Sequence, residues 1–270
     1  MLLAAFAAGL ALATATPTIV SLIPSLTEDL FAIGAGPQVV ATSQFTDYPA
    51  AAAKLPQVAS FQSLDAERIV ELHPSVVVGI PAQASLVADL RRAGLHVELL
   101  RDDSFEDLFA AIGRLGALAG RAREAAALSA SMRARTAQLV RTVPPGPQPR
   151  TFIVLGTAPI FTVGDGSYIA HLLALAGGRN ASGVREPYAR YSAEALLAAQ
   201  PDAIVADRQS GLESMLDRPP WNALRAVRAG RVYVLDDADI LERPGPRYNE
   251  GLAWLIARLH GKSGRNAAHQ

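Results

Sequence analysis

The chain has 270 residues, half of them hydrophobic, and its 25 basic and 25 acidic side chains give a formal charge of zero. Such a chain can form one large domain or two ordinary ones with a substantial core. The balanced charge argues against binding to nucleic acid or to an anionic membrane surface. The sequence contains no cysteine, which excludes disulfides, thiolate metal sites, cysteine nucleophiles and a lipid anchor on one of its cysteines.

Residues 1–15 have the character of an export signal. A short apolar stretch is followed by the small-residue site Ala13-Thr-Ala15, and it is too short to span a bilayer comfortably. An export signal normally begins with a basic region, whereas the first Lys or Arg of this chain is Lys54. The alternative interpretation is a buried helix. We expect a signal peptide over 1–15.

Alternating strands and helices over residues 16–119 predict an N-terminal α/β lobe with a parallel sheet. Ser25-Leu-Thr-Glu28 has the spacing of a capping box and predicts the start of a helix that runs to Ile33 and ends at the following glycines. The strands are expected at 18–23, 39–42, 76–79 and 97–100, with further helices near 65–73, 83–93 and 104–118.

A connecting helix is expected at 120–143. The stretch from Arg121 to Arg141 is rich in Ala, Leu and Arg without Pro or Gly, and would be about 30 Å long as a helix. Residues 144–149 then form a proline-rich break. Because a single helix resists hinge bending, we expect the two lobes to close on a ligand by only a small rotation around a preformed cleft.

The pattern of the first lobe restarts after this break and predicts a C-terminal α/β lobe over 149–262, followed by a tail at 263–270. Strands are expected at 151–155, 203–206 and 231–235, with helices at 168–176, 193–200, 211–217 and 247–260. The predicted fold is therefore α/β, with two Rossmann-like lobes, parallel sheets, one long connecting helix and a ligand cleft between the lobes.

One pattern occurs twice, 127 residues apart, at residues 64–79 and 191–206. Each copy begins with a helix-capping residue, places a carboxylate in the first helical turn, and passes through a proline into a β-branched strand. The two carboxylates are Glu67 and Glu194. Acidic residues in a first turn offset the helix dipole and need no partner, so their local role can be purely structural.

Motifs for catalysis are weak. Gly261-Lys-Ser263 lacks the first glycine of a phosphate loop, and Ser167 of Gly164-Asp-Gly-Ser167 is explained by helix capping. The five histidines are scattered without metal-ligand spacing. We therefore expect no enzyme activity, no resident cofactor and no metal site. An enzyme on a doubly wound scaffold would need clustered His, Cys or paired acids in its cleft.

Aromatic residues make up only 6% of the chain, yet several lie in loops expected at the carboxyl ends of strands, where open α/β sheets bind ligands. They are Tyr48, Phe61, Phe161 and Tyr188. Packing within the loops would explain each alone. Together they favour a large, flat, partly apolar ligand. Asp239 and Arg243 could bind polar groups of that ligand, although the same loop could simply be solvated.

The order of motifs along the chain resembles the class III periplasmic substrate-binding proteins of ABC importers, and within them the cobalamin-binding branch. The matching segments are Ile23-Pro-Ser-Leu-Thr-Glu28, Thr46-Asp-Tyr-Pro49, Glu67-Arg-Ile-Val, Phe161-Thr-Val-Gly164, Ala176-Gly-Gly-Arg-Asn180, Glu186-Pro-Tyr188, Gly230-Arg-Val-Tyr-Val-Leu235 and Arg243-Pro-Gly-Pro-Arg247. The resemblance implies two lobes bridged by a long helix, delivery of a ligand to a membrane permease, and no catalysis.

The resemblance implies that Tyr48, Phe61, Phe161 and Tyr188 are cleft aromatics and that Asp239 and Arg243 contact side groups of a corrinoid. The chain departs from that branch because Phe61, Tyr188 and Ile80 stand where a relative has larger aromatic residues, which reduces the ring area. A ferric siderophore or haem would fit the same scaffold, with Tyr48 or Tyr188 as an axial ligand of haem.

The resemblance also implies that Glu67 and Glu194 dock into arginine pockets on the two permease subunits. The expected partners are thus a corrinoid ligand and the permease with its ATPase, and the expected form is a periplasmic monomer that does not bind nucleic acid. A third interpretation is an interaction module without a small-molecule ligand, which predicts a collapsed or solvent-filled space between the lobes.

Overall fold

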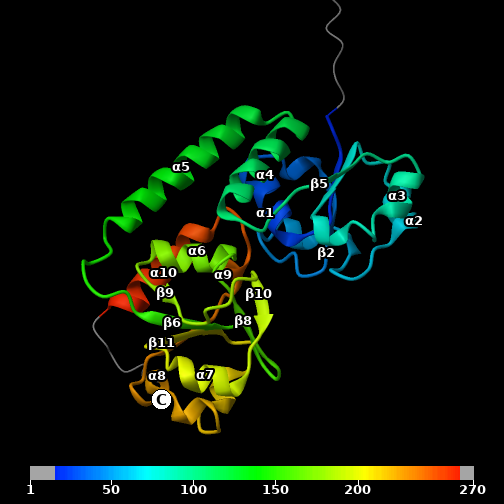
Figure 1. Cartoon of the computed structure of the whole chain (residues 1–270). Helices are drawn as coiled ribbons and strands as arrows, with labels where there is room; N and C mark the ends of the chain where they lie inside the picture. Colours follow the sequence, from blue (N-terminus) through cyan, green and yellow to red (C-terminus); the bar gives the residue numbers. More distant parts are fainter. Residues whose placement is uncertain (1–15, 262–270) are drawn as a thin grey trace, which may run out of the picture.

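The computed structural model describes residues 16–261, which form two α/β lobes joined by the long helix α5 (Ala122–Val140) (Figure 1). The predicted signal peptide at 1–15 and the predicted tail at 263–270 lie outside the described residues. Helix α5 falls within the segment 120–143 that the composition indicated. The two lobes, the parallel sheets and the single connecting helix confirm the predicted fold class.

The N-terminal lobe contains a parallel five-stranded sheet in the order β3-β2-β1-β4-β5. Its strands are β1 (Ile19–Ser21), β2 (Val39–Ser43), β3 (Gln57–Ala59), β4 (Val76–Gly79) and β5 (Val97–Leu99). The helices are α1 (Pro24–Ala32), α2 (Ala66–Glu71), α3 (Ala88–Arg92) and α4 (Phe105–Leu118), with 3₁₀ turns at Gly36–Gln38, Ala52–Lys54 and Pro81–Gln83.

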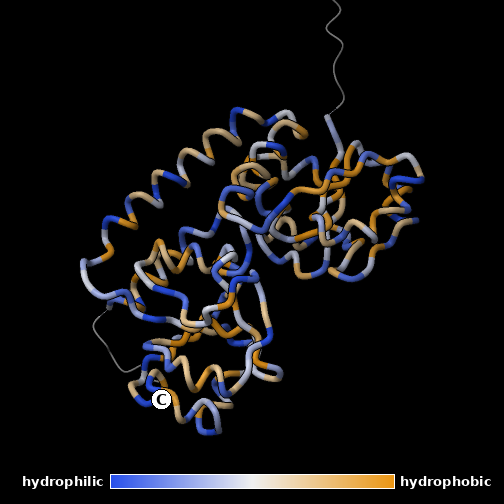
Figure 2. Tube along the Cα trace, viewed as in Figure 1, coloured by the Kyte–Doolittle hydropathy of each residue, from blue (hydrophilic) through white to orange (hydrophobic). Residues whose placement is uncertain are grey.

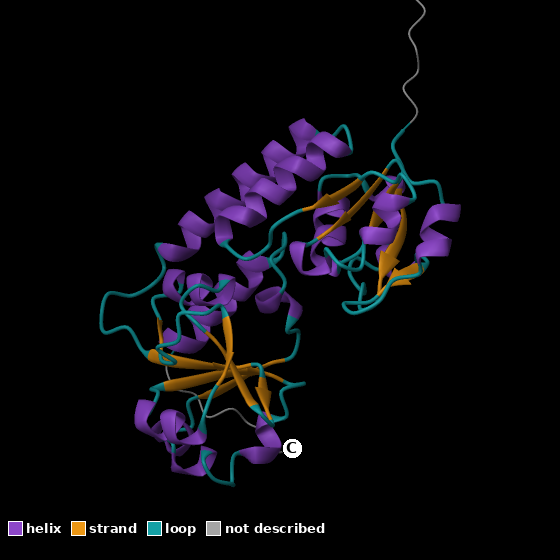
Figure 3. Cartoon of the chain, turned by 45° about the vertical axis from the view of Figure 1, so that its right-hand side comes forward, coloured by secondary structure: helices purple, strands orange, loops and turns teal. Residues whose placement is uncertain are grey.

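The C-terminal lobe contains a parallel four-stranded sheet in the order β12-β11-β6-β9, with helices on both of its sides (Figure 3). Its strands are β6 (Arg150–Val154), β9 (Arg179–Asn180), β11 (Ala203–Asp207) and β12 (Val232–Leu235). The helices are α6 (Tyr168–Leu175), α7 (Ala193–Ala199), α8 (Arg225–Arg228), α9 (Asp239–Glu242) and α10 (Tyr248–His260), with 3₁₀ turns at Leu212–Met215 and Trp221–Ala223.

A second, antiparallel sheet of the C-terminal lobe was not predicted. It consists of β7 (Gly156–Thr157), β8 (Ile160–Val163) and β10 (Tyr188–Arg190), in the order β10-β8-β7. Its strands are two to four residues long, too short for alternation of apolar and polar residues to be a clear signal. This sheet carries two of the predicted aromatic residues.

Several helix predictions need correction. The capping box does not form: α1 begins at Pro24 with Ile23 as its N-cap residue and without a side-chain cap. The helix expected over 83–93 is shorter, because only Ala88–Arg92 is α-helical. Residues Leu212–Met215 form a 3₁₀ turn instead of the helix expected over 211–217.

The sequence repeat corresponds to a structural repeat. Asp65 accepts a hydrogen bond from the backbone N–H of Arg68 at 3.0 Å, and Ser192 accepts one from Ala195 at 3.1 Å, so both helices are capped as predicted. Both helices end at a residue in the left-handed region, His73 (φ 45°) and Gln200 (φ 40°), just before the proline of each copy.

In each copy, the side chain of the residue after the proline accepts a hydrogen bond from a backbone N–H at or just before the first strand of its lobe. Ser75 Oγ accepts from the backbone N–H of Thr18 at 3.1 Å, and Asp202 Oδ2 accepts from that of Arg150 at 2.9 Å. The strand orders β2-β1-β4-β5 and β9-β6-β11-β12 are also the same. The sequence repeat therefore reflects two lobes with the same strand topology. Strand β1 corresponds to β6, and β4 corresponds to β11.

One hydrophobic cluster extends through both lobes. It contains Ile19 and Leu108 of the N-terminal lobe together with Ile153 and Leu252 of the C-terminal lobe. Figure 2 shows hydrophobic stretches inside each lobe and an alternation of hydrophobic and hydrophilic residues along α5. Opening the lobes widely would expose this shared core to water, which is unfavourable by about 25 cal/mol for each Å² of apolar surface.

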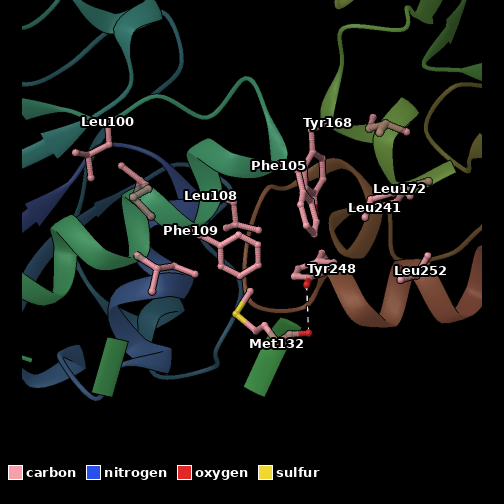
Figure 4. Packing of buried hydrophobic residues seen from close by; sticks show 14 of the residues in the cluster. Leu100, Phe105, Leu108, Phe109, Met132, Tyr168, Leu172, Leu241, Tyr248 and Leu252 are labelled. Carbon is pink, nitrogen blue, oxygen red and sulfur yellow. Dashed lines mark hydrogen bonds between the residues drawn. The ribbon is translucent and has the colours of Figure 1, made fainter. Parts of the chain in front are cut away.

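Aromatic packing occupies the centre of that shared core (Figure 4). The ring of Phe105 on α4 stacks on His171 of α6 at 4.6 Å between centroids and meets Tyr248 of α10 edge-on at 5.1 Å. The Tyr248 hydroxyl donates to the carbonyl of Met132 on α5 at 3.3 Å, and Asn249 Nδ2 donates to the same carbonyl at 3.0 Å. Helix α5 is therefore fixed to the C-terminal lobe near its middle as well as at its end.

Candidate ligand-binding site

The strand order places the ligand-binding edge of each lobe. In both sheets the chain moves first to one side of the central strand and then to the other, so the order reverses between β1 and β4 and between β6 and β11. Open α/β sheets bind ligands beyond the carboxyl ends of the strands at such a reversal. The segments after β1, β4, β6 and β11 therefore form the expected ligand-binding edges of the two lobes.

The reversal point of the N-terminal lobe is closed. Gln83 is buried there, its side-chain NH₂ donates to the carbonyl of Leu22 after β1 at 3.0 Å, and its side-chain oxygen accepts from the N–H of Ile80 after β4 at 3.2 Å. One amide thus joins the two strand ends and fills the space between them.

The reversal point of the C-terminal lobe is open. A hollow of about 470 Å³ lies between the residues that follow β6, including Leu155 and Thr157, and those that follow β11, Gln209 and Ser210. Phe161 and Arg190 of the antiparallel sheet form another side of it. The two lobes share a topology but differ at this point: the Gln83 amide joins the strand ends of the N-terminal lobe, whereas a hollow lies between the corresponding segments of the C-terminal lobe.

The exposed large hydrophobic side chains of residues 16–261 include all four of the predicted cleft aromatics. The complete set is Phe45, Tyr48, Phe61, Val140, Phe161, Tyr188 and Leu197. Scattered exposed apolar residues need no explanation, but five aromatic rings from the two lobes are a distinct group. Phe45 is 77% exposed but was not among the predicted site residues.

The antiparallel sheet aligns three of the side chains. Tyr188 and Arg190 are two residues apart on β10, and Arg190 pairs with Phe161 on β8. Because side chains alternate between the faces of a strand, Tyr188, Arg190 and Phe161 share one face. Tyr188 is 47% exposed. The structure thus brings two predicted aromatics together beside an arginine.

Tyr188 lies among acidic groups. Burial, followed by the negative charges of Asp102 and Glu242, raises the pKa of its phenol to about 12. Burial and the neighbouring Asp103 raise the pKa of Asp102 to about 6. Burial and a hydrogen bond with Asp207 raise the pKa of Glu242 to about 8.

Tyr48, Asp239 and Arg243 come together around a group of ion pairs at the junction of the lobes. Arg243 contacts Asp239 at 2.8 Å within its own lobe. The same guanidinium donates to Glu28 at 3.1 Å, to Asp47 at 2.9 Å and to the carbonyl of Phe45 at 2.8 Å, all in the N-terminal lobe. Arg243 therefore binds the two lobes to each other, and its role toward a ligand remains a prediction.

Residues that the sequence reasoning missed complete this group. Glu28 is 2% exposed and receives hydrogen bonds from Arg247 as well as from Arg243. The guanidinium of Arg247 also lies 4.2 Å from the centre of the Tyr48 ring, a cation–π contact that supports the ring from one side. Tyr48 nevertheless remains 46% exposed, which leaves ring surface for a ligand.

Asp239 has an unusual environment. Burial raises its pKa to about 6 despite the nearby Arg243, with Asp47 and Asp237 adding negative charge.

Phe61 lies apart from these groups, in the loop between β3 and α2, and is 63% exposed. The six predicted ligand residues thus fall in three places: the ion-pair group, the antiparallel sheet and the loop of Phe61.

Glu67 and Glu194 occupy equivalent first turns on α2 and α7, and both are exposed. Hydrogen bonds from its own backbone N–H and from the Ser192 hydroxyl lower the pKa of Glu194. Glu67 lines a shallow hollow of about 470 Å³ between α2 and α3, with Val70 and Leu90 at its apolar floor. Leu197, 37% exposed, lies one turn after Glu194, as Val70 lies one turn after Glu67.

In residues 16–261 no group of three or more His, Cys, Asp or Glu side chains has the arrangement of a metal site. Within the same part of the chain, no helix is both long and apolar enough to cross a membrane.

Comparison with known proteins identifies the family. Residues 19–238 match the model of the periplasmic binding protein family. An uncharacterized ABC transporter substrate-binding lipoprotein of Bacillus subtilis is 28% identical over 251 residues, which cover 90% of this chain and 79% of that protein. A vitamin B12-binding protein of Vibrio cholerae is 32% identical over 234 residues, which cover 85% of this chain and 84% of that protein.

Solved structures give the same result. The crystal structure of the periplasmic vitamin B12 binding protein of Vibrio cholerae has a TM-score of 0.80 and 28% identity, covering 90% of this chain and 96% of that one. A periplasmic heme binding protein from Pseudomonas aeruginosa has a TM-score of 0.79 and 28% identity, covering 92% and 94%. The chain therefore belongs to the periplasmic binding protein family and is a substrate-binding protein rather than an enzyme.

Proposed function

We propose that this chain binds cobalamin or a related corrinoid between its lobes and delivers it to the permease of an ABC importer. Family membership implies a small-molecule ligand, a permease with its ATPase, and a periplasmic location. The observation that carries the ligand proposal is the set of exposed aromatic rings from both lobes, Tyr48 and Phe61 on one side and Phe161 and Tyr188 on the other. A corrin ring is large, flat and partly apolar, and rings of this kind bind such a surface.

The polar surroundings also suit a corrinoid. The periphery of a corrin ring carries neutral amide groups, which donate hydrogen bonds to carboxylates and accept them from arginines. Asp239 and Asp102 are partly buried carboxyl groups at the junction of the lobes and beside Tyr188. Carboxyl groups of this kind, placed around exposed rings, can bind amides without requiring a charged ligand.

Haem is the second candidate, since relatives of the same fold bind it. A tyrosine coordinates ferric iron as a phenolate, and the burial and neighbouring acidic groups that raise the pKa of Tyr188 to about 12 oppose that form. Tyr188 is therefore a poor axial ligand in this environment. Tyr48 is the tyrosine through which haem would bind, with its ring against Arg247.

Titration calorimetry with cyanocobalamin, haemin and a ferric siderophore tests the ligand class directly. We expect cyanocobalamin to bind with a dissociation constant below about 1 μM, equivalent to about −8 kcal/mol. If cyanocobalamin fails to bind at that level and haemin binds, the corrinoid proposal is wrong and the haem alternative stands.

We propose that Glu67 and Glu194 dock to the importer, each together with the apolar side chain one helical turn later. An arginine of the permease would pair with the carboxylate, and an aliphatic side chain would cover Val70 or Leu197. The equivalent positions of the two pairs in the structural repeat support this proposal.

We further propose that the chain acts as a monomer. Sedimentation analysis at micromolar concentration would test this.

A further inference from the structure

The hollow at the reversal point of the C-terminal lobe adjoins the aromatic site described above. It lies at the carboxyl ends of β6 and β11, and Phe161 links it to the aromatic face that carries Tyr188. Its volume of about 470 Å³ is within the range of small-molecule sites. A group that extends from a ligand held on Phe161 and Tyr188 would therefore reach it.

Arg190 gives this hollow a positive charge. Two other arginines of the C-terminal lobe are already paired: Arg208 with Asp236 and Glu213, and Arg247 with Glu28 and Asp237. Among residues 16–261, no carboxylate lies within 4.0 Å of the Arg190 guanidinium, and the side chain is exposed. A ligand can thus bind Arg190 without breaking an ion pair of the protein.

The remaining wall is polar but already bonded internally. The Thr157 hydroxyl donates to the carbonyl of Ser210 at 2.9 Å, which joins the segments after β6 and β11 and keeps the hollow in shape. Gln209 also lines the hollow, together with Phe161. The lining therefore includes one planar cation with several N–H groups, an amide residue and an aromatic residue.

We propose that this hollow is an anion subsite, in which Arg190 binds a phosphate or carboxylate group on an arm of the ligand. The inference rests on the proposed function, because the ligand ring must first lie on the neighbouring aromatic face. A guanidinium binds such anions through two parallel N–H···O bonds. Cobalamin has a phosphodiester in its nucleotide arm, cobinamide lacks that arm, and haem has two carboxylates.

The subsite predicts a preference between ligands that share one ring system. Wild-type protein should bind cyanocobalamin more tightly than dicyanocobinamide. Arg190→Gln should weaken cyanocobalamin binding by about 10- to 100-fold, the range expected for a charge-assisted hydrogen bond, and should leave dicyanocobinamide binding unchanged. Arg190→Lys should restore part of the loss, and Arg208→Gln, a neighbouring arginine already in ion pairs, should change neither affinity.

Calorimetry at two salt concentrations measures these differences. Equal loss of both corrinoids in Arg190→Gln, or no loss of either, would overturn the subsite while leaving corrinoid binding in place. If wild-type protein binds haemin and no corrinoid, the proposed ligand is wrong and the subsite is tested with haemin and its dimethyl ester. A loss in Arg190→Gln that is confined to haemin would then support it, and an equal loss of both would overturn it.

Discussion

Glu28 of the N-terminal lobe and Arg247 of the C-terminal lobe form a two-pronged ion pair. Arg247 Nε donates to Oε2 of Glu28 at 2.9 Å and Nη2 donates to Oε1 at 3.1 Å. Both side chains are largely buried, and Arg243 adds a third hydrogen bond to the same carboxylate. This carboxylate therefore joins the lobes and, through Arg247, supports the ring of Tyr48.

Glu28→Gln should lower the free energy of unfolding substantially. Removing one partner of a buried pair leaves a buried charge without compensation, which costs about 3–5 kcal/mol. The lower end of that range is expected, because Asp237 still neutralises Arg247 and Asp47 still neutralises Arg243. Urea unfolding measures the change.

The control for Glu28→Gln is Glu71→Gln, which removes the exposed ion pair with Arg68. This substitution should change the free energy of unfolding by less than about 1 kcal/mol. Similar effects of both substitutions would contradict the interpretation.

The next residue, Asp29, should make stability depend on pH. It is completely buried, and within residues 16–261 neither of its carboxyl oxygens has a hydrogen-bond partner. Burial followed by the charge of Glu28 raises its pKa well above the ordinary value. A raised pKa means that the folded state holds the proton more tightly than the unfolded state does. The contribution of the protonated carboxyl to the free energy of unfolding is fully present at pH values below the pKa of the unfolded state. It is lost as the pH rises through the pKa of the folded state.

Asp29→Asn removes this titration. Its free energy of unfolding relative to wild type should therefore increase as pH rises, with a slope of at most about 1.4 kcal/mol per pH unit between the two pKa values. Urea unfolding at pH 5, 7 and 9 tests the prediction. A constant difference between Asp29→Asn and wild type across this range would show that the carboxyl does not titrate with folding.

The sequence predicted the lobes well because their signals are local. Capping residues, first-turn carboxylates and β-branched runs recur at a fixed offset, and the structure repeats even the left-handed residues His73 and Gln200. The exposed aromatic residues were also predictable, because few aromatics occur and several fall at strand ends. In each case the physical cause lies within a few residues of the feature it produces.

Glu28 shows why the rest was not predictable. Its spacing from Ser25 indicated a capping box, but its carboxylate binds arginines 215 and 219 residues away. Arg247 was quoted in a motif without a role, since only the folded chain brings it beneath Tyr48. The antiparallel sheet was missed because its short strands give little local pattern and pair residues far apart in the sequence, such as Phe161 and Arg190, which are 29 residues apart.

Loss of a cleft ring should weaken ligand binding without affecting the fold. Tyr188→Ala should weaken cyanocobalamin binding by about tenfold, equivalent to about 1.4 kcal/mol, because the stacking surface is lost. Tyr188→Phe keeps the ring and should bind nearly as wild type does. Calorimetry measures both, with Val140→Ala as an exposed apolar control on α5. Wild-type affinity in Tyr188→Ala would exclude this ring from the site.

Docking to the importer should depend on the carboxylate and on the apolar residue one turn later. Charge reversal of Glu67 and Glu194 together should abolish uptake of labelled cyanocobalamin by cells that express the variant chain, while calorimetry shows unchanged ligand binding. Leu197→Ser should reduce uptake less severely, because it removes apolar contact from the interface of one lobe and retains the ion pair.

The matched control for Leu197 is Val140→Ser, since both side chains are 37% exposed and Val140 lies on the connecting helix far along the chain from either docking turn. Normal uptake in Leu197→Ser together with loss in the charge-reversal variant would limit docking to the carboxylates. If the charge-reversal variant instead fails to bind cyanocobalamin, the two carboxylates belong to the ligand site. Uptake would then fail because the chain carries no ligand to the importer.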